Sequence, residues 1–188
     1  MSQNSQLFSS KFGGEIEIPS PTLHDGLPFS VPANTSDEQL EITKAVCSGA
    51  KSVFKDVTNR DVKDLQFDSK GKIHTYDNLI VATMNLKLNG QLYLIELNIP
   101  SQSYLRLITS IVGDQQSSIT DDNIDWVAEI LNMISNHIAI YLKSKKGWAI
   151  KRDIPAVVGL CPGFREVKAG SQQSVVASYR FFIRIIKV

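Results

Sequence analysis

Hydrophobic residues recur every three to four positions in two long stretches of the chain, and this spacing predicts two amphipathic helices. The first begins after Ser36, a residue type that favours the N-cap position, and ends near residue 57. The second spans residues 121–144 and stops before Gly147. A shorter helix over residues 103–112 is expected between them. Each long helix has an apolar face and must therefore pack against another element.

Two segments of β-type sequence, residues 79–88 and 91–99, flank the dipeptide Asn89-Gly90. Both residues of this dipeptide tolerate positive φ, so the pattern predicts a tight hairpin. Residues 148–160 predict a further strand that is interrupted near Asp153 and Pro155. Each long helix is thus followed by strands, which indicates two similar halves.

The C-terminal residues 174–188 form a long run rich in β-branched and aromatic side chains. Arg180 and Arg184 give the run a partial alternation, which predicts one solvated face. The order of elements predicts an α+β fold with a largely antiparallel sheet and the long helices packed on one face of it. A run of this length at a sheet edge would also invite pairing with another chain.

Residues 1–36 differ from the rest of the sequence. They hold four of the seven prolines, and their hydrophobic periodicity is weak. We expect a flexible or loosely docked arm here, followed by one folded domain over residues 37–188.

The amino-acid composition limits the functional classes to which the protein can belong. Of the 188 residues, 43% are hydrophobic and 21% are charged, which is typical of a globular protein with a sizeable core. The net charge is +1 without a basic block, which argues against a nucleic-acid partner. No apolar run approaches the roughly 20 residues of a membrane span, and we expect no signal sequence, because the first residues lack a charged stretch followed by an apolar one. We expect a cytoplasmic protein in which Cys47 and Cys161 are buried thiols.

The sequence lacks the common patterns of metal, nucleotide and serine-hydrolase sites. No group of His, Cys, Asp and Glu residues has the spacing of metal ligands, and we expect no intrinsic metal or cofactor. The phosphate-binding loop, the dinucleotide-binding glycine pattern and the Gly-x-Ser-x-Gly elbow do not occur.

The second long helix has the most informative polar face. Helical spacing places four polar residues within an arc of roughly 60°, namely Asp125, Glu129, Asn132 and Asn136. Asparagine is a mediocre helix former, so two amides on one face suggest a contact outside the helix. An ordinary solvated face is the alternative interpretation. Trp126 and Met133 border the arc and are candidate apolar contacts for a partner.

The segment Glu129-Ile-Leu-Asn-Met-Ile-Ser-Asn136 resembles the signature of the CheC/CheX/FliY family, in particular of its CheX type. The resemblance extends over about residues 38–188 and includes Ala50-Lys-Ser-Val-Phe54 and Ile154-Pro-Ala-Val-Val-Gly159. CheC-type members carry a second Glu-x-x-Asn on the first helix, where this chain has Glu41-Ile-Thr-Lys44. The chain therefore resembles the one-site CheX pattern, with Ile134-Ser135 in place of the Ala-Gly of many relatives.

This resemblance implies a duplicated α+β fold and hydrolysis of the aspartyl phosphate on a CheY-like receiver domain. Glu129 would pair with the active-site Lys of the receiver, and Asn132 would orient the attacking water. The Mg²⁺ ion would belong to the receiver. The neighbouring side chains of Asp125, Trp126, Met133 and Asn136 would contact the same partner.

The resemblance also implies a homodimer with a shared sheet, and residues 174–188 are our candidate for its edge strand. Two other functions remain open at this point. The helix could bind a receiver or another signalling partner without catalysis, as an adaptor. The chain could also be a structural dimerisation module.

Overall fold

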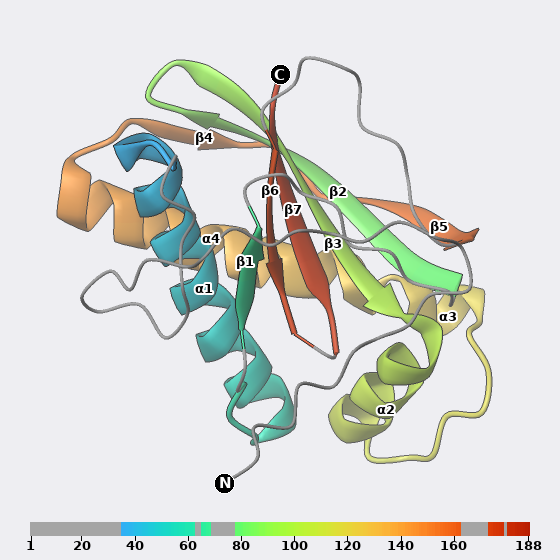
Figure 1. The fold of residues 1–188 in the computed structure, drawn as a ribbon. Coiled ribbons are helices and arrows are strands. Elements are labelled where there is room, and N and C mark those ends of the chain that lie inside the picture. The colour runs from blue at the N-terminus through green and yellow to red at the C-terminus, as the bar shows by residue number, and fades with distance from the viewer. Residues whose placement is uncertain (1–34, 63–64, 69–77, 163–172, 179) are drawn as a thin grey trace, which may run out of the picture.

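The computed structural model describes residues 35–62, 65–68, 78–162, 173–178 and 180–188 (Figure 1). The helices are α1 (Asp37–Thr58), α2 (Ser101–Val112), α3 (Asp121–Ile124) and α4 (Trp126–Lys146). The strands are β1 (Gln66–Asp68), β2 (Asn78–Leu88), β3 (Gln91–Pro100), β4 (Ile150–Arg152), β5 (Ala156–Pro162), β6 (Gln173–Ala177) and β7 (Phe182–Lys187). The arm that we expect over residues 1–36 lies outside the described residues, apart from its last two.

The seven strands of the described residues form one antiparallel sheet in the order β1-β6-β7-β3-β2-β4, and β5 pairs with β2, as β4 does. The first half of the chain contributes α1, β1 and the β2–β3 hairpin, and the second half contributes α4, β4, β5 and the β6–β7 hairpin. The two hairpins meet at β3 and β7 in the middle of the sheet. Strand β1 pairs with the hairpin of the second half, and β4 and β5 pair with the hairpin of the first. The α+β fold is therefore confirmed, and each half completes the sheet of the other.

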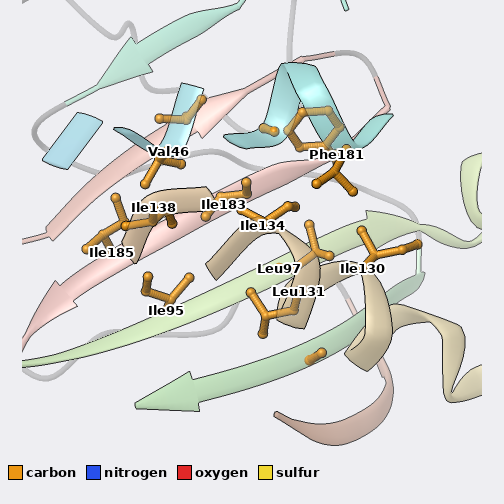
Figure 2. Packing of buried hydrophobic residues seen from close by; sticks show 14 of the residues in the cluster. Val46, Ile95, Leu97, Ile130, Leu131, Ile134, Ile138, Phe181, Ile183 and Ile185 are labelled. Atoms are coloured by element: carbon orange, nitrogen blue, oxygen red, sulfur yellow. The ribbon is translucent and has the colours of Figure 1, made fainter. Parts of the chain in front are cut away.

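The hydrophobic core lies between one face of the sheet and the helices α1 and α4 (Figures 1 and 2). Figure 2 shows Ile134 and Ile138 of α4 clustered with Val46 of α1 and the strand residues Ile183 and Ile185. Burial of such large aliphatic side chains contributes about 1.5–3 kcal/mol each. The two long helices cover one face, as the hydrophobic spacing of the sequence predicts.

The opposite face of the sheet carries a buried ion pair. Arg184 of β7 lies directly across from Glu96 of β3, and the distance from Arg184 Nη1 to Glu96 Oε2 is 3.0 Å. Both side chains are buried. The prediction that Arg184 lies on a solvated face is wrong, because its charge is matched by a carboxylate that comes from a different strand. A smaller apolar cluster on this face includes Val81, Val175 and Phe182.

Residues 174–188 do not form one long edge strand, which corrects the prediction. The chain turns between β6 and β7, where the Ser178 N–H donates to the Phe181 carbonyl at 2.9 Å. Strand β6 lies between β1 and β7, and β7 lies between β6 and β3. The high β propensity of this run therefore reflects two interior strands, in which residues 175–177 and 182–186 are buried.

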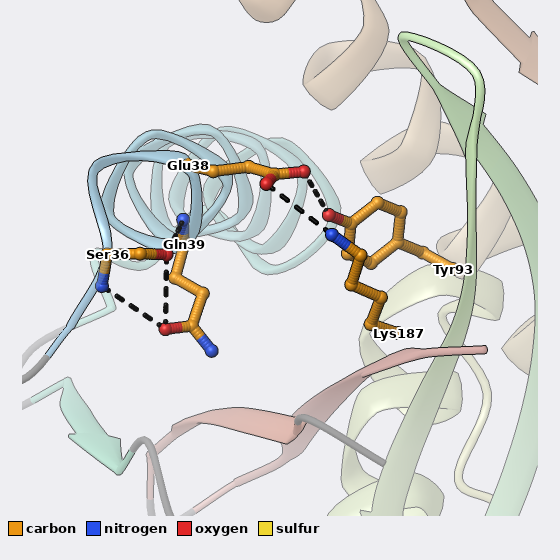
Figure 3. Close-up of polar contacts among 5 residues, drawn as sticks. All are labelled: Ser36, Glu38, Gln39, Tyr93 and Lys187. Carbon is orange, nitrogen blue, oxygen red and sulfur yellow. Dashed lines mark hydrogen bonds and ion pairs between the residues drawn. The ribbon is translucent and has the colours of Figure 1, made fainter.

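The start of α1 is fastened to the middle of the sheet (Figure 3). Ser36 caps the helix by accepting a hydrogen bond from the Gln39 N–H at 3.2 Å. Glu38 in the first turn accepts a hydrogen bond from the Tyr93 hydroxyl of β3 and lies 3.6 Å from the Lys187 ammonium of β7. Burial and the adjacent Glu38 raise the pKa of the Tyr93 hydroxyl, so it stays protonated and remains a donor.

The two cysteines differ in their burial. Cys47 is buried, and burial raises the pKa of its thiol to about 12, whereas Cys161 is half-buried. Neither cysteine forms a disulfide. Among the helices that the structure describes, none is long and apolar enough to cross a membrane.

Candidate functional site

Helix α4 places the predicted polar face toward solvent. Ile130, Ile134 and Ile138 point into the core, and this fixes the opposite side of the helix outward (Figure 2). Four predicted site residues are exposed on that side, namely Asp125, Glu129, Asn132 and Asn136. Glu129 and Asn132 are three residues apart, so their side chains lie on neighbouring turns of one face, with Cβ atoms about 5–6 Å apart.

The start of α4 is set by a buried tyrosine. The hydroxyl of Tyr104, from α2, donates to the backbone carbonyl of Ile124 at 2.9 Å and also contacts that of Asn123. The Ala128 N–H then donates to Asp125 at 3.0 Å, one residue closer than in a regular α-helix. One helix over residues 121–144 was predicted, but the structure breaks it at Asp125. A tertiary hydrogen bond, which the sequence pattern does not reveal, accounts for the break.

Asn123 holds the segment that leads into the break. Its side-chain oxygen accepts from the Thr120 N–H at 2.9 Å, and its amide nitrogen donates to the Ser118 carbonyl at 3.0 Å. Asp125 therefore sits at a defined junction between α3 and α4, and it remains on the exposed side with Glu129.

An exposed apolar stripe runs beside the polar residues of α4. Trp126 and Met133 are each 37% exposed, and Ile140, a further seven residues along, is 59% exposed. Seven residues are nearly two helical turns, so the three side chains follow one line along the helix. The sequence interpretation included Trp126 and Met133 but missed Ile140, although its spacing could have revealed it.

Arg152, the last residue of β4, reaches the candidate site from a different element. Its Nη1 atom donates to the side-chain oxygen of Asn132 at 3.4 Å, to the Asn132 carbonyl at 3.4 Å and to Ser135 Oγ at 3.1 Å. The buried Ser135 hydroxyl in turn donates to the Asn132 carbonyl at 2.8 Å. Asn132 therefore contacts both Arg152 and Ser135, whereas Glu129 has no contact of this kind in the described structure.

The strand that carries Arg152 is fixed against β2. Arg152 pairs with Leu86 in the register of the sheet. The next residue, Asp153, donates its N–H to the Asn85 carbonyl at 3.1 Å and accepts from the Asn85 side chain at 3.1 Å. The interruption predicted near Asp153 and Pro155 is confirmed, because β4 ends at this point and β5 begins at Ala156.

The site consists of exposed polar side chains. Among the described residues, no three His, Cys, Asp or Glu side chains are grouped so that they could hold a metal ion. The amide of Asn132 can donate and accept hydrogen bonds, and the carboxylate of Glu129 can pair with a cation. The arrangement suits a surface that meets the site of another protein.

Comparisons with known proteins identify the fold. No protein-family model and no curated protein sequence matches the chain. Among solved structures, the chain is similar to the chemotaxis protein CheX from Vibrio vulnificus, with a TM-score of 0.66 and 16% identity over 78% of this chain and 98% of that one. A CheC-like superfamily protein from Shewanella sp. PV-4 gives a TM-score of 0.64 and 18% identity over 78% and 97% of the two chains.

The CheX–CheY–BeF3–Mg²⁺ complex from Borrelia burgdorferi also matches, with a TM-score of 0.53 and 13% identity over 78% of this chain and 96% of that one. Because the sequence identities are only 13–18%, the similarity to these structures establishes the fold alone. The chain has the fold of CheX and CheC-like proteins, so the fold that the motif resemblance implies is confirmed.

Proposed function

We propose that this protein binds a phosphorylated CheY-like receiver domain through the exposed face of α4 and accelerates hydrolysis of its aspartyl phosphate. The observation that carries the proposal is the exposure of Glu129 and Asn132 on one face of α4, within a CheX-like fold. The solved complex of a CheX with CheY adds support, since a protein of the same fold is named there with a receiver.

The chemistry requires little from this chain beyond position. An aspartyl phosphate is already reactive, so catalysis consists mainly of orientation and electrostatic stabilisation. The oxygen of water forms a bond to phosphorus while the bond from phosphorus to the aspartyl oxygen breaks. The products are a free carboxylate and inorganic phosphate. One proton of the water stays with the phosphate, and the other is released to solvent.

Asn132 would hold the attacking water in line with the bond that breaks. An amide can accept a hydrogen bond from water without becoming protonated, so it acts throughout the neutral pH range. Glu129 would anchor the active-site Lys of the receiver, and Asp125, Trp126, Met133 and Asn136 would line the contact surface. The receiver would supply the Mg²⁺ ion that neutralises the phosphoryl charge.

The test is the decay of a phosphorylated receiver. Candidate receivers are phosphorylated with acetyl phosphate, the donor is removed, and the decay is followed with and without this protein. Asn132→Ala is expected to lower the rate enhancement by about 10²-fold, because the variant loses a preorganised group at the reacting atoms. The unfolding transition should stay nearly unchanged, since Asn132 is exposed.

Asn78→Ala is the matched control, because it removes another exposed amide, which belongs to β2 and not to α4. It is expected to leave the decay rate unchanged. A protein that binds the receiver but does not accelerate decay would be an adaptor, and full activity of Asn132→Ala would contradict the proposed mechanism.

A further inference from the structure

Arg152 contacts the side-chain oxygen of Asn132. We propose that Arg152 is a positioning residue that fixes the orientation of the Asn132 amide at the site. The catalytic consequence rests on the proposed function, whereas the contact itself is independent of it.

The first argument is the chemistry of the donor. A guanidinium group has only N–H donors and no acceptor. The group of Asn132 that faces Arg152 Nη1 at 3.4 Å must therefore be the oxygen. With its oxygen held there, the amide cannot rotate by half a turn about its last side-chain bond without placing an N–H against a cation. Arg152 thus determines which end of the amide is presented to a partner.

The second argument is that Arg152 makes more than one contact. A single N–H···O distance of 3.4 Å lies beyond the usual range, so that bond alone would be weak. The same nitrogen also donates to the buried Ser135 Oγ at 3.1 Å, and Ser135 donates to the Asn132 carbonyl at 2.8 Å. A buried hydroxyl has a fixed position, so it anchors the guanidinium beside the amide.

The third argument is that the backbone of Arg152 is itself held. Strand β4 pairs with β2, and Asp153 makes two hydrogen bonds with Asn85. Placing a long side chain costs conformational entropy of the backbone and of the side-chain rotamers. The pairing of β4 with β2 already fixes the backbone, so only the rotamers of Arg152 remain to be ordered. Strand β4, which follows α4 in the chain, therefore brings Arg152 beside the amide of Asn132 on α4.

The consequence for the reaction follows from the acceptor sites of the amide. A carbonyl oxygen has two lone pairs, and Arg152 occupies one of them. The other lone pair remains available for a proton of the attacking water, and the two N–H groups remain available to an acceptor on the partner. Loss of Arg152 would leave the amide present but free to rotate, which lowers the fraction of time in the productive orientation.

The test compares Arg152→Ala with Arg152→Lys in the decay assay. At saturating protein, Arg152→Ala is expected to lower the rate about tenfold through misorientation, with little change in the concentration that gives half-saturation. Arg152→Lys retains one cationic donor nitrogen and should recover most of the rate. Lys151→Ala removes the same charge from the adjacent exposed residue and should leave both quantities unchanged.

A double-substitution cycle isolates the link to the amide. In an Asn132→Ala background, Arg152→Ala should have no further effect on the rate. Additive effects, or a change confined to half-saturation, would overturn the positioning role and would indicate direct contact of Arg152 with the receiver.

Nuclear magnetic resonance tests the contact without any receiver. The side-chain amide signals of Asn132, identified by their loss in Asn132→Ala, should shift in Arg152→Ala and stay in place in Lys151→Ala. Unchanged signals in Arg152→Ala would overturn the proposal. If the parent protein does not accelerate decay, the proposed hydrolysis fails and the catalytic consequence of Arg152 fails with it, while these signals still decide whether Arg152 orients the amide.

Discussion

Glu129 presents an exposed carboxylate on α4, and its charge should contribute to binding of the receiver. Glu129→Gln keeps the size of the side chain and removes the charge. We expect it to weaken binding to a BeF3-activated receiver by about 1 kcal/mol, a typical value for a partly solvated ion pair. Calorimetry at low and high ionic strength measures the binding free energy of both proteins. Added salt should weaken binding of the parent protein more than binding of Glu129→Gln.

Asp114→Asn provides the charge-matched control, because Asp114 is exposed in the segment after α2. The Asp114→Asn protein should bind the receiver with the same affinity as the parent protein at every salt concentration. Equal affinities of Glu129→Gln and the parent would remove Glu129 from the contact surface.

The candidate site was partly predictable at the level of single residues. Helical spacing was enough to place Glu129 and Asn132 on one outward face, because the apolar residues of the same helix determine which side is buried. The contact of Arg152 with Asn132 was not predictable, because it depends on the register of β4 against β2. A motif search along the sequence cannot detect a pair that the sheet brings together.

At the level of elements, the packing of α1 against α4 depends on Gly49. A Cβ atom added there would lie 3.1 Å from the Ile134 carbonyl oxygen and 3.1 Å from His137 Cβ. Alanine would gain about 1 kcal/mol of helix propensity, but such overpacking costs about 1–3 kcal/mol. We expect Gly49→Ala to destabilise the protein by about 1 kcal/mol, as measured by chemical denaturation.

Ser48→Ala, at the adjacent exposed position of α1, changes helix propensity without adding a contact to α4, so it measures the effect of propensity alone. It should stabilise the protein slightly, by about 0.5 kcal/mol. Similar stabilisation by both substitutions would mean that α4 moves freely to accommodate the added methyl group.

Elements with strong local signals were predicted well. The cap at Ser36 and the turn at Asn89-Gly90 both have the expected backbone conformations, and both Asn89 and Gly90 have positive φ. Strand β1 was missed, because three residues carry too little periodicity to stand out. The run over 174–188 was read as one strand, because its turn lacks Gly and Pro.

At the level of the whole molecule, the predicted homodimer needs a different junction. Strands β6 and β7 lie inside the sheet, so among the described strands the edges are β1 on one side and β4 with β5 on the other. The β5 region exposes apolar side chains, with Ile154 90%, Leu160 52% and Val158 42% exposed. We therefore expect pairing of β5 with its copy in a second chain.

Sedimentation at micromolar concentrations tests this arrangement. Val158→Lys combined with Leu160→Lys should convert the dimer into a monomer, because charges on an edge strand oppose strand pairing. Val112→Lys changes another exposed apolar residue, at the end of α2, and should leave the dimer intact. A monomeric parent protein at all concentrations would contradict the dimer.

The exchange of outer strands between the halves affects the order in which the chain can fold during synthesis. When residues 1–112 have left the ribosome, β1 lacks β6 and the β2–β3 hairpin has unpaired edges on both sides. The first half is therefore not expected to fold alone, because β1, β2 and β3 each pair with a strand that follows α4. A fragment that ends at Val112 should therefore lack fixed tertiary structure in near-ultraviolet circular dichroism, and a native-like spectrum would contradict this. Helix α4 acquires its buried face, and with it the outward direction of Asn132, late in synthesis.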